Sequence, residues 1–296
     1  MLISSLIANL PRLNCTGYFW TGSKIKKLTY GVYYSPHVFY SLLLRIYFMN
    51  NTLSKIIRSV VNRFGYEITK CDYLEMKAFA WHLRKLFTTL NITCVLDVGA
   101  NTGGYRNFLR NHVGFDGLIL SFEPVQKNVE QLATLAKTDL NWIIYDFALG
   151  SEDAKKEINI MQSDQMCSFL SPHHEIINEL KVSNTIIDNQ LVSIRKLDSI
   201  ISMLNERHKL HNIYLKMDTQ GFDLEVIKGA EKTLPLVRAL QTEVSIIPVY
   251  ENMPAFFEIH KILSESNFDI TGLFPVTRDS HQRVIEFDCV MINKLN

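Results

Sequence analysis

The sequence lacks the features that mark several large classes of protein. Its five cysteines are odd in number and widely spread, and none forms a C-x-x-C pair, so neither a disulfide framework nor a zinc site is predicted. Lysine and arginine total 31 against 30 aspartates and glutamates, a balance that does not indicate a nucleic-acid-binding protein. Internal repeats and low-complexity segments are also missing. These absences predict a reduced, cytoplasmic globular protein with enough apolar material for one large core.

The least regular part of the chain is the N-terminal extension, residues 1–48. A signal peptide is not predicted there, because the lysines follow the first apolar run instead of preceding it. A second apolar run, at 32–49, approaches the length of a membrane span but contains Arg45, which is costly at the centre of a bilayer. We therefore favour a disordered extension, or a start assigned too early with Met49 as the true start, over a membrane anchor.

Two N-terminal helices are predicted within residues 49–92. In the first, at 53–64, apolar residues recur at the i, i+3, i+4 spacing of a helix, and three basic residues lie off that stripe. Such a basic face is typical of solvent exposure, and it would also suit peripheral contact with an acidic membrane surface. The second helix covers about 74–90 and has apolar side chains along one face.

Strands and helices alternate in the main domain, residues 93–296. Short apolar runs predict strands at 94–98, 118–122 and 142–147, with helical spacing between them. A series of this kind implies a parallel sheet with right-handed crossovers. Residues 150–195 interrupt the alternation, and we expect an inserted, hairpin-like pair of strands there, at 156–161 and 190–194, which forms the edge of a lid.

The alternation resumes after this insertion. We predict further strands at 213–217, 239–245, about 269–274 and 285–292, and helices at 224–228 and around 256–263, the latter with Pro254 in its first turn. A polar turn separates the last two strands, so these are expected to pair as an antiparallel hairpin.

A glycine-rich turn, Asp97-Val-Gly99-Ala-Asn101-Thr-Gly103-Gly104, follows the first strand of this domain. Ligands of open α/β sheets bind outside the carboxyl ends of the strands, and glycines there allow backbone to approach them closely. A dinucleotide site would have glycine in place of Asn101, and Asp97 would repel a pyrophosphate. A carboxylate at this turn instead favours a ligand with positive groups, such as the ammonium and sulfonium of S-adenosylmethionine.

Two more acids follow the next two strands. Glu123 is placed to accept hydrogen bonds from both hydroxyls of a ribose, and Asp146 to accept one from an adenine amino group, with Phe147 against the adenine face. Each acid alone could equally cap a helix or a loop. Because three acids end three successive strands beside a glycine turn, we predict a cofactor site.

Together these motifs resemble those of the FkbM family of methyltransferases. The likeness begins at 95–104, where the family also has asparagine in place of the usual middle glycine, and continues through Glu123 and 147–150. Residues 215–222, Leu-Lys-Met-Asp-Thr-Gln-Gly-Phe, are similar to its most characteristic motif, although many members have glutamate where this chain has Gln220. The resemblance covers about residues 50–293.

The resemblance implies a fold and an activity. The fold is the α/β, Rossmann-like class I methyltransferase fold, a mostly parallel seven-stranded sheet with an antiparallel C-terminal hairpin. The activity is S-adenosylmethionine-dependent O-methylation, often of sugar hydroxyls in glycans, glycolipids or glycosylated metabolites. Methylation of nitrogen or carbon in a small metabolite, and cofactor binding without catalysis, remain as alternatives.

Lys216, Asp218 and Glu243 are the candidate catalytic residues for such a transfer. Lys216 and Asp218 are two residues apart at the end of a strand, so both project to the same side. Asp218 is the candidate general base, and Lys216 would orient it or bind an acidic acceptor. A purely structural ion pair would also explain the two residues. Glu243 ends the next strand as a second acid, and Tyr250 suits either a sugar-binding face or the core.

Overall fold

The computed structural model describes residues 15–21, 24–30, 59, 63, 73–173 and 185–295. The chain divides into two compact units, Met1–Cys71 and Asp72–Asn296. Within the described ranges, none of the helices combines the length and apolarity of a membrane span.

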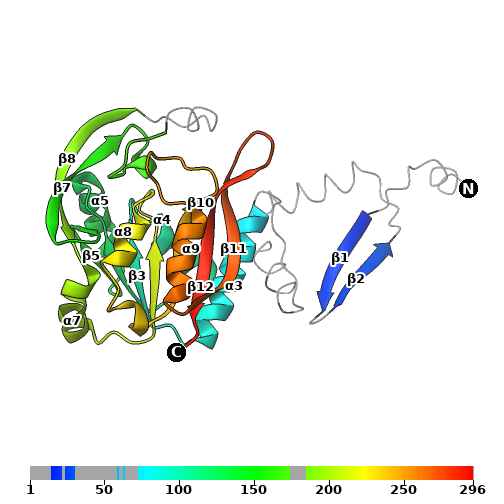
Figure 1. Cartoon of the computed structure of the whole chain (residues 1–296). Helices are drawn as coiled ribbons and strands as arrows, with labels where there is room; N and C mark the ends of the chain where they lie inside the picture. The colour runs from blue at the N-terminus through cyan, green and yellow to red at the C-terminus, as the bar shows by residue number, and fades with distance from the viewer. Residues whose placement is uncertain are drawn as a thin grey trace, which may run out of the picture. The chain divides into compact units, whose positions relative to one another are not determined.

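The first unit contains an antiparallel pair of strands, β1 (Cys15–Thr21) and β2 (Lys24–Tyr30) (Figure 1). No regular element was predicted from the sequence in this stretch. The apolar run at 32–49 lies outside the described residues. Of the helix predicted at 53–64, the structure describes Ser59 and Arg63, both in helical conformation.

The second unit is built on a seven-stranded sheet with the order β11-β12-β10-β9-β3-β4-β5 (Figure 1). Neighbouring strands from β10 to β5 are parallel, whereas β12 is antiparallel to both β10 and β11. The strands are β3 (Cys94–Val98), β4 (Leu118–Phe122), β5 (Trp142–Tyr145), β9 (Ile213–Met217), β10 (Val237–Ser245), β11 (Phe268–Arg278) and β12 (Val284–Asn293). This topology confirms the predicted class I methyltransferase fold with its C-terminal hairpin.

A smaller sheet, with the order β6-β8-β7, contains the predicted insertion. β7 (Ala154–Met161) and β8 (Ile186–Arg195) form the expected antiparallel pair, and β6 (Ala148–Leu149) runs parallel to β8. The strand predicted at 142–147 therefore ends earlier than expected. β5 ends at Tyr145, the chain bends, and it enters the other sheet as β6.

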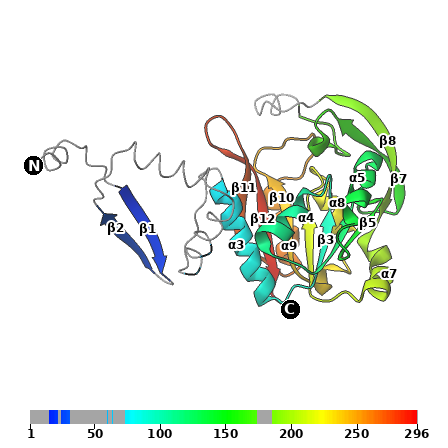
Figure 2. The same ribbon diagram turned by 180° about the vertical axis from the view of Figure 1, so that it is seen from behind.

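Helices cover both faces of the large sheet. One face packs against α3 (Leu74–Thr89), α5 (Gln126–Ala136) and the continuous turns α4 (Gly104–Phe108) and η2 (Leu109–Val113). The other packs against α7 (Leu197–His208), α8 (Asp223–Lys228) and α9 (Phe256–Glu265). α8 and α9 lie in front of the sheet in Figure 1, and α3 and α4 come to the front in Figure 2. Pro254 precedes the N-cap of α9, Ala255, instead of occupying its first turn.

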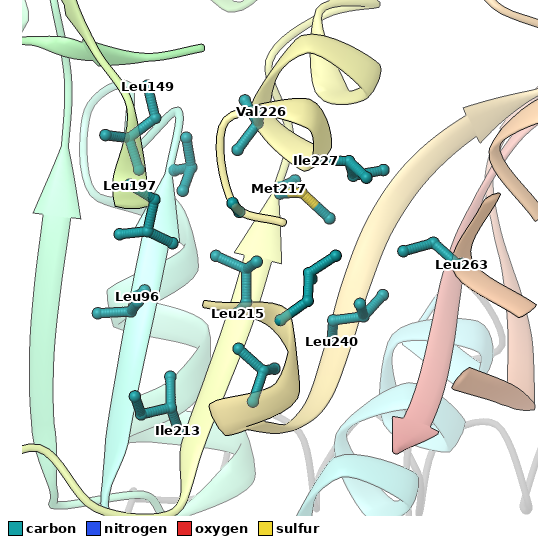
Figure 3. Close-up of a cluster of buried hydrophobic side chains, with 14 of the residues drawn as sticks. Leu96, Leu149, Leu197, Ile213, Leu215, Met217, Val226, Ile227, Leu240 and Leu263 are labelled. Carbon is teal, nitrogen blue, oxygen red and sulfur yellow. The ribbon is translucent and has the colours of Figure 1, made fainter. Parts of the chain in front are cut away.

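Strand alternation divides the core between these faces. Leu96 on β3, Leu215 on β9 and Leu240 on β10 are fully buried and point into the cluster beneath α7, α8 and α9 (Figure 3). Burying a side chain of this size stabilises the fold by about 1.5–3 kcal/mol. Intervening residues point to the opposite face, which is how Asp97 and Lys216 come to lie inside the molecule.

Candidate functional site

A cavity of about 310 Å³ lies at the carboxyl ends of the parallel strands, where open α/β sheets bind their ligands. The structure brings six of the predicted site residues into its lining: Gly99, Asn101, Glu123, Lys216, Asp218 and Glu243. Four others do not line it: Asp97, Gly103, Asp146 and Phe147. One cavity therefore brings together residues predicted to bind the cofactor and residues predicted to be catalytic.

The glycines of the turn after β3 are required by the protein's own packing. Gly99 has a φ of +76°, and a Cβ there would lie 1.9 Å from the backbone oxygen of Asp218. Gly103 has a φ of +86°, and a Cβ there would meet the ring of Trp142 at 2.9 Å. From the sequence, these glycines were expected to allow the close approach of a ligand. At both positions the close neighbour is instead another part of the chain.

Several backbone N–H groups of this turn already donate within the protein. Those of Gly99 and Ala100 donate to the Phe122 oxygen at 3.0 and 3.2 Å, and that of Asn101 donates to Glu123 Oε2 at 2.7 Å. Free N–H groups at such a turn are what hold a pyrophosphate in dinucleotide sites. The Oδ1 atom of Asn101 is buried and accepts no hydrogen bond from the described residues, so it can accept one from a ligand.

Glu123 is held at the end of β4 with 4 % of its surface exposed. Its Oε1 atom accepts hydrogen bonds from Val125 N at 3.0 Å and from Asn128 Nδ2 at 3.4 Å. Burial raises the pKa of Glu123 to about 7, although these hydrogen bonds oppose the rise. Asn128 was not predicted as a site residue; it is a buried polar residue one helical turn before Leu132 on the inner face of α5.

Asp97 does not face the cavity, contrary to the sequence analysis. It is fully buried, its Oδ1 lies 3.0 Å from Lys216 Nζ, and its Oδ2 accepts a hydrogen bond from Ser121 Oγ at 2.9 Å. The three residues are register partners on neighbouring strands and project to the same side of the sheet. Strand alternation thus turns Asp97 into the core, where Lys216 balances its charge.

Lys216 connects this buried pair to the candidate base. Its Nζ lies 3.5 Å from Asp218 Oδ2 and donates to the backbone oxygen of Gly99 at 3.1 Å. Burial alone would lower the pKa of Lys216, but Asp97 and Asp218 raise it above its usual value, so the lysine remains charged. Lys216 is therefore both a structural partner of Asp97 and a fixed positive charge beside Asp218.

Asp218 and Glu243 are joined by a residue to which the sequence analysis gave no role. Gln220 Nε2 donates to Asp218 Oδ1 and to Glu243 Oε2, both at 2.9 Å. Removal from water, together with the nearby carboxyls led by that of Asp218, raises the pKa of Glu243 well above its ordinary value. The side chain of Asp218 is 36 % exposed. The buried Tyr250 donates to Gln220 Oε1, so it belongs to this network and not to an open sugar-binding face.

Asp146 and Phe147 lie where the chain bends between the two sheets. Asp146 is exposed, and the ring of Phe147 packs on Tyr145 with a centroid distance of 5.6 Å. The structure thus gives no support to their predicted contacts with adenine. The cavity has an apolar wall to which Val125, Ile158 and Phe169 contribute.

Residues 163–171, here called the strap, form another part of the wall. Asn101 Nδ2 donates to the backbone oxygen of Asp164 at 3.0 Å, and Lys127 pairs with the Asp164 side chain at 2.9 Å. Ser168 Oγ donates to the backbone oxygen of Gln220 at 2.7 Å. The strap thus contacts both the cofactor side and the catalytic side of the cavity, in the region where a lid was expected.

The charges of the cavity favour a ligand that carries positive groups. Its lining contains four acids and one lysine: Glu123, Asp164, Asp218, Glu243 and Lys216. Lys216 already balances Asp97, and Lys127 pairs with Asp164, so Asp218 and Glu123 are the acids left to repel a pyrophosphate and to attract an ammonium or sulfonium. A preference for a positively charged ligand was predicted from Asp97, and these other carboxylates support it instead.

Comparison with known proteins matches residues 97–270 to the family model described as the methyltransferase FkbM domain. No curated protein matches the sequence.

Solved structures with a similar chain path include several methyltransferases. The FkbM methyltransferase of Methylobacillus flagellatus is 16 % identical, with a TM-score of 0.44 over 68 % of this chain and 44 % of that one. The chain thus spans less than half of that protein's length. Aeropyrum pernix fibrillarin with S-adenosyl-L-methionine is 10 % identical (TM-score 0.40, 68 % and 66 % covered). Synechocystis magnesium protoporphyrin IX methyltransferase, also with its cofactor, is 11 % identical (TM-score 0.39, 86 % and 96 % covered).

Proposed function

This chain belongs to the FkbM methyltransferase family, which makes it an S-adenosylmethionine-dependent methyltransferase, and we propose that its acceptor is a sugar hydroxyl. The sugar would belong to a glycan, a glycolipid or a glycosylated metabolite. The observation that carries the proposal is the position of Asp218. It lies in the wall of the cavity that also holds the glycine turn and Glu123, with a fixed positive charge beside it.

The polar groups of the cavity suit the cofactor. Glu123 would accept hydrogen bonds from the ribose hydroxyls, and the unpartnered Oδ1 of Asn101 would accept one from a further donor of the ligand. The apolar wall that includes Ile158 and Phe169 would cover the adenine. In this assignment Asp97 acts indirectly, by holding Lys216.

When bound, S-adenosylmethionine supplies an electrophilic methyl group on a sulfonium. The protein must then hold the acceptor oxygen in line and remove its proton as the new bond forms. Asp218 is the candidate to remove this proton. Gln220 holds its Oδ1 atom, and its Oδ2 atom lies on the side of Lys216. Lys216 places a fixed positive charge beside this carboxylate.

A hydroxyl-bearing acceptor fits the catalytic end of the cavity. Thr219, Gln220 and Glu243 surround Asp218 there with oxygen atoms that can accept further hydrogen bonds. Sugar hydroxyls both donate and accept, so several can be bound at once by such a surface.

The proposal is tested by methyl transfer from labelled S-adenosylmethionine to a panel of methyl glycosides of hexoses and 6-deoxyhexoses. Label in a sugar methyl ether is the expected result. Asp218→Asn should keep cofactor affinity and lower the rate by about 10²–10⁴-fold, the usual effect of a general base. Glu152→Gln, at an exposed position outside the lining of the cavity, serves as the matched control. Full activity in Asp218→Asn would contradict the assignment of the base and direct attention to Glu243.

Chelation separates a direct base from a metal-assisted one. If Asp218 and Glu243 ligate a divalent ion, a chelator should abolish transfer and the added ion should restore it. We expect a rate that is indifferent to chelator. Label found on nitrogen or carbon of another class of acceptor, with all glycosides unmodified, would refute the sugar assignment.

A further inference from the structure

The side chain of Gln220 joins the two acids of the cavity to a buried tyrosine. Its Nε2 donates to Asp218 Oδ1 and Glu243 Oε2, each at 2.9 Å, and its Oε1 accepts from Tyr250 Oη at 2.8 Å. A primary amide has two N–H donors, and both are used here. Rotating the amide by half a turn would place its oxygen against the two carboxyl groups and its N–H₂ against the tyrosine. The orientation of Gln220 is therefore determined by its partners.

The surrounding backbone fixes the position of this amide. Gln220 has a φ of +52°, in the left-handed region, and its backbone oxygen accepts from Ser168 Oγ of the strap at 2.7 Å. Tyr250 is 1 % exposed, and its hydroxyl also lies 3.1 Å from the backbone oxygen of Met166. The network thus spans the turn after β9, the end of β10, the strap and the loop that contains Tyr250.

The electrostatic surroundings make an uncharged donor useful at this point. The charged and titratable groups that face Asp218 and Glu243 come from β9, α8, β12 and the Tyr250 loop: Lys216, Asp223, Glu286, Asp288 and Tyr250. All but Lys216 and Tyr250 are carboxyls. The Gln220 amide donates to both acids without adding charge, whereas a glutamate would add another carboxylate and remove both donors.

We propose that Gln220 is a positioning residue of the methyl-transfer site: held by Tyr250, its amide fixes the Oδ1 side of Asp218 and thereby leaves Oδ2 to take the acceptor's proton. This inference rests on the proposed function. It goes further in naming the oxygen that receives the proton and the two residues that select it. The Oδ2 atom is also the one that lies 3.5 Å from Lys216 Nζ.

The proposal is tested in the full chain by ¹³C NMR titration of the Glu243 carboxyl, assigned with Glu243→Gln. Gln220→Glu removes the donors and adds a negative charge, so it should raise the pKa of Glu243 by a further 1 or more, about tenfold in proton affinity. Tyr250→Phe leaves the amide without its anchor and should shift the titration in the same direction by less. The added charge of Gln220→Glu shifts this titration by itself, so Tyr250→Phe, which adds no charge, is the variant that reports on the anchoring of the amide.

Two matched controls accompany these variants. Gln131→Glu adds the same charge on the exposed face of α5, and Tyr145→Phe removes a hydroxyl that contacts His208, away from the acids. Both should leave the Glu243 titration unchanged. If Gln220→Glu does not fold, Tyr250→Phe decides the question. A Glu243 titration that matches wild type in every folded variant of Gln220 and Tyr250 would overturn the proposal.

Calorimetry with S-adenosylmethionine on the wild-type chain separates this result from the proposed function. If the wild type binds no S-adenosylmethionine, the proposed function fails whatever the titration shows. If it binds and the Glu243 titration does not respond, the inference about Gln220 fails on its own.

Discussion

At the scale of single residues, buried carboxyls govern how the protein responds to pH. Burial raises the pKa of Glu123 to about 7, from 4.5 for a free glutamate, and that of Asp288 to about 7, from 3.8. At a pH between the unfolded and folded pKa of each group, the folded state holds a proton that the unfolded state has lost. Folding stability therefore falls as pH rises through this window.

We predict that the melting temperature of the protein without cofactor decreases from about pH 5 to about pH 8. Glu123→Gln removes one of the titrating groups, so the slope of melting temperature against pH should become shallower. Glu152→Gln, an exposed control, should keep the wild-type slope. Scanning calorimetry across this range is the measurement, and equal slopes in wild type and Glu123→Gln would contradict the assigned pKa of Glu123.

The types of residue at the site were more predictable from sequence than the directions in which their side chains point. Glu123 and Asp218 follow strands directly, and both line the cavity as expected. Asp97 belongs to the same motif, but its direction depends on the alternation of β3 and on Lys216, a partner 119 positions away in sequence. Gln220 lay in a recognised motif. Its role depends on contacts with Glu243 and Tyr250, which spacing along one strand does not reveal.

At the scale of elements, the strands with uninterrupted apolar runs were the most predictable. β3, β4 and β9 have the predicted bounds because each is buried on both faces between two helical layers. α7 was missed although Leu197, Ile200 and Leu204 recur at helical spacing, because the polar insertion before it obscured where the alternation resumed. The end of β5 at Tyr145 was not predicted because Phe147 continues the apolar pattern beyond Asp146.

The close approach of the turns after β3 and β9 gives a prediction about glycine. Gly99→Ala would place a Cβ 1.9 Å from the Asp218 backbone oxygen at a positive φ, so it should destabilise the fold by more than about 3 kcal/mol. Gly104 begins α4 with open space around it, and Gly104→Ala should stabilise by about 0.4–1 kcal/mol. Urea unfolding compares the pair. Similar stabilities for the two variants would show that the turns do not approach as described.

At the scale of the whole molecule, the division of the chain into units predicts what can be removed. Asp72–Asn296 contains the large sheet, the core and the cavity. A protein that starts at Met49 should therefore be soluble and folded, and should bind S-adenosylmethionine with the affinity of the full chain. Light scattering, thermal melting and calorimetry on both proteins provide the comparison. Aggregation of the shortened protein, or melting far below the full chain, would show that residues 1–48 stabilise the domain.

The central claim is that this cavity binds S-adenosylmethionine, and calorimetry on the full chain tests it most directly. S-adenosylmethionine and its demethylated product should both bind, whereas NAD should not, because the lining is acidic and the N–H groups of Gly99, Ala100 and Asn101 already donate within the protein. Glu123→Ala should weaken binding of S-adenosylmethionine by about 1–3 kcal/mol, the effect of losing a hydrogen bond to a charged group. Tight binding of NAD, with none of S-adenosylmethionine, would contradict the account.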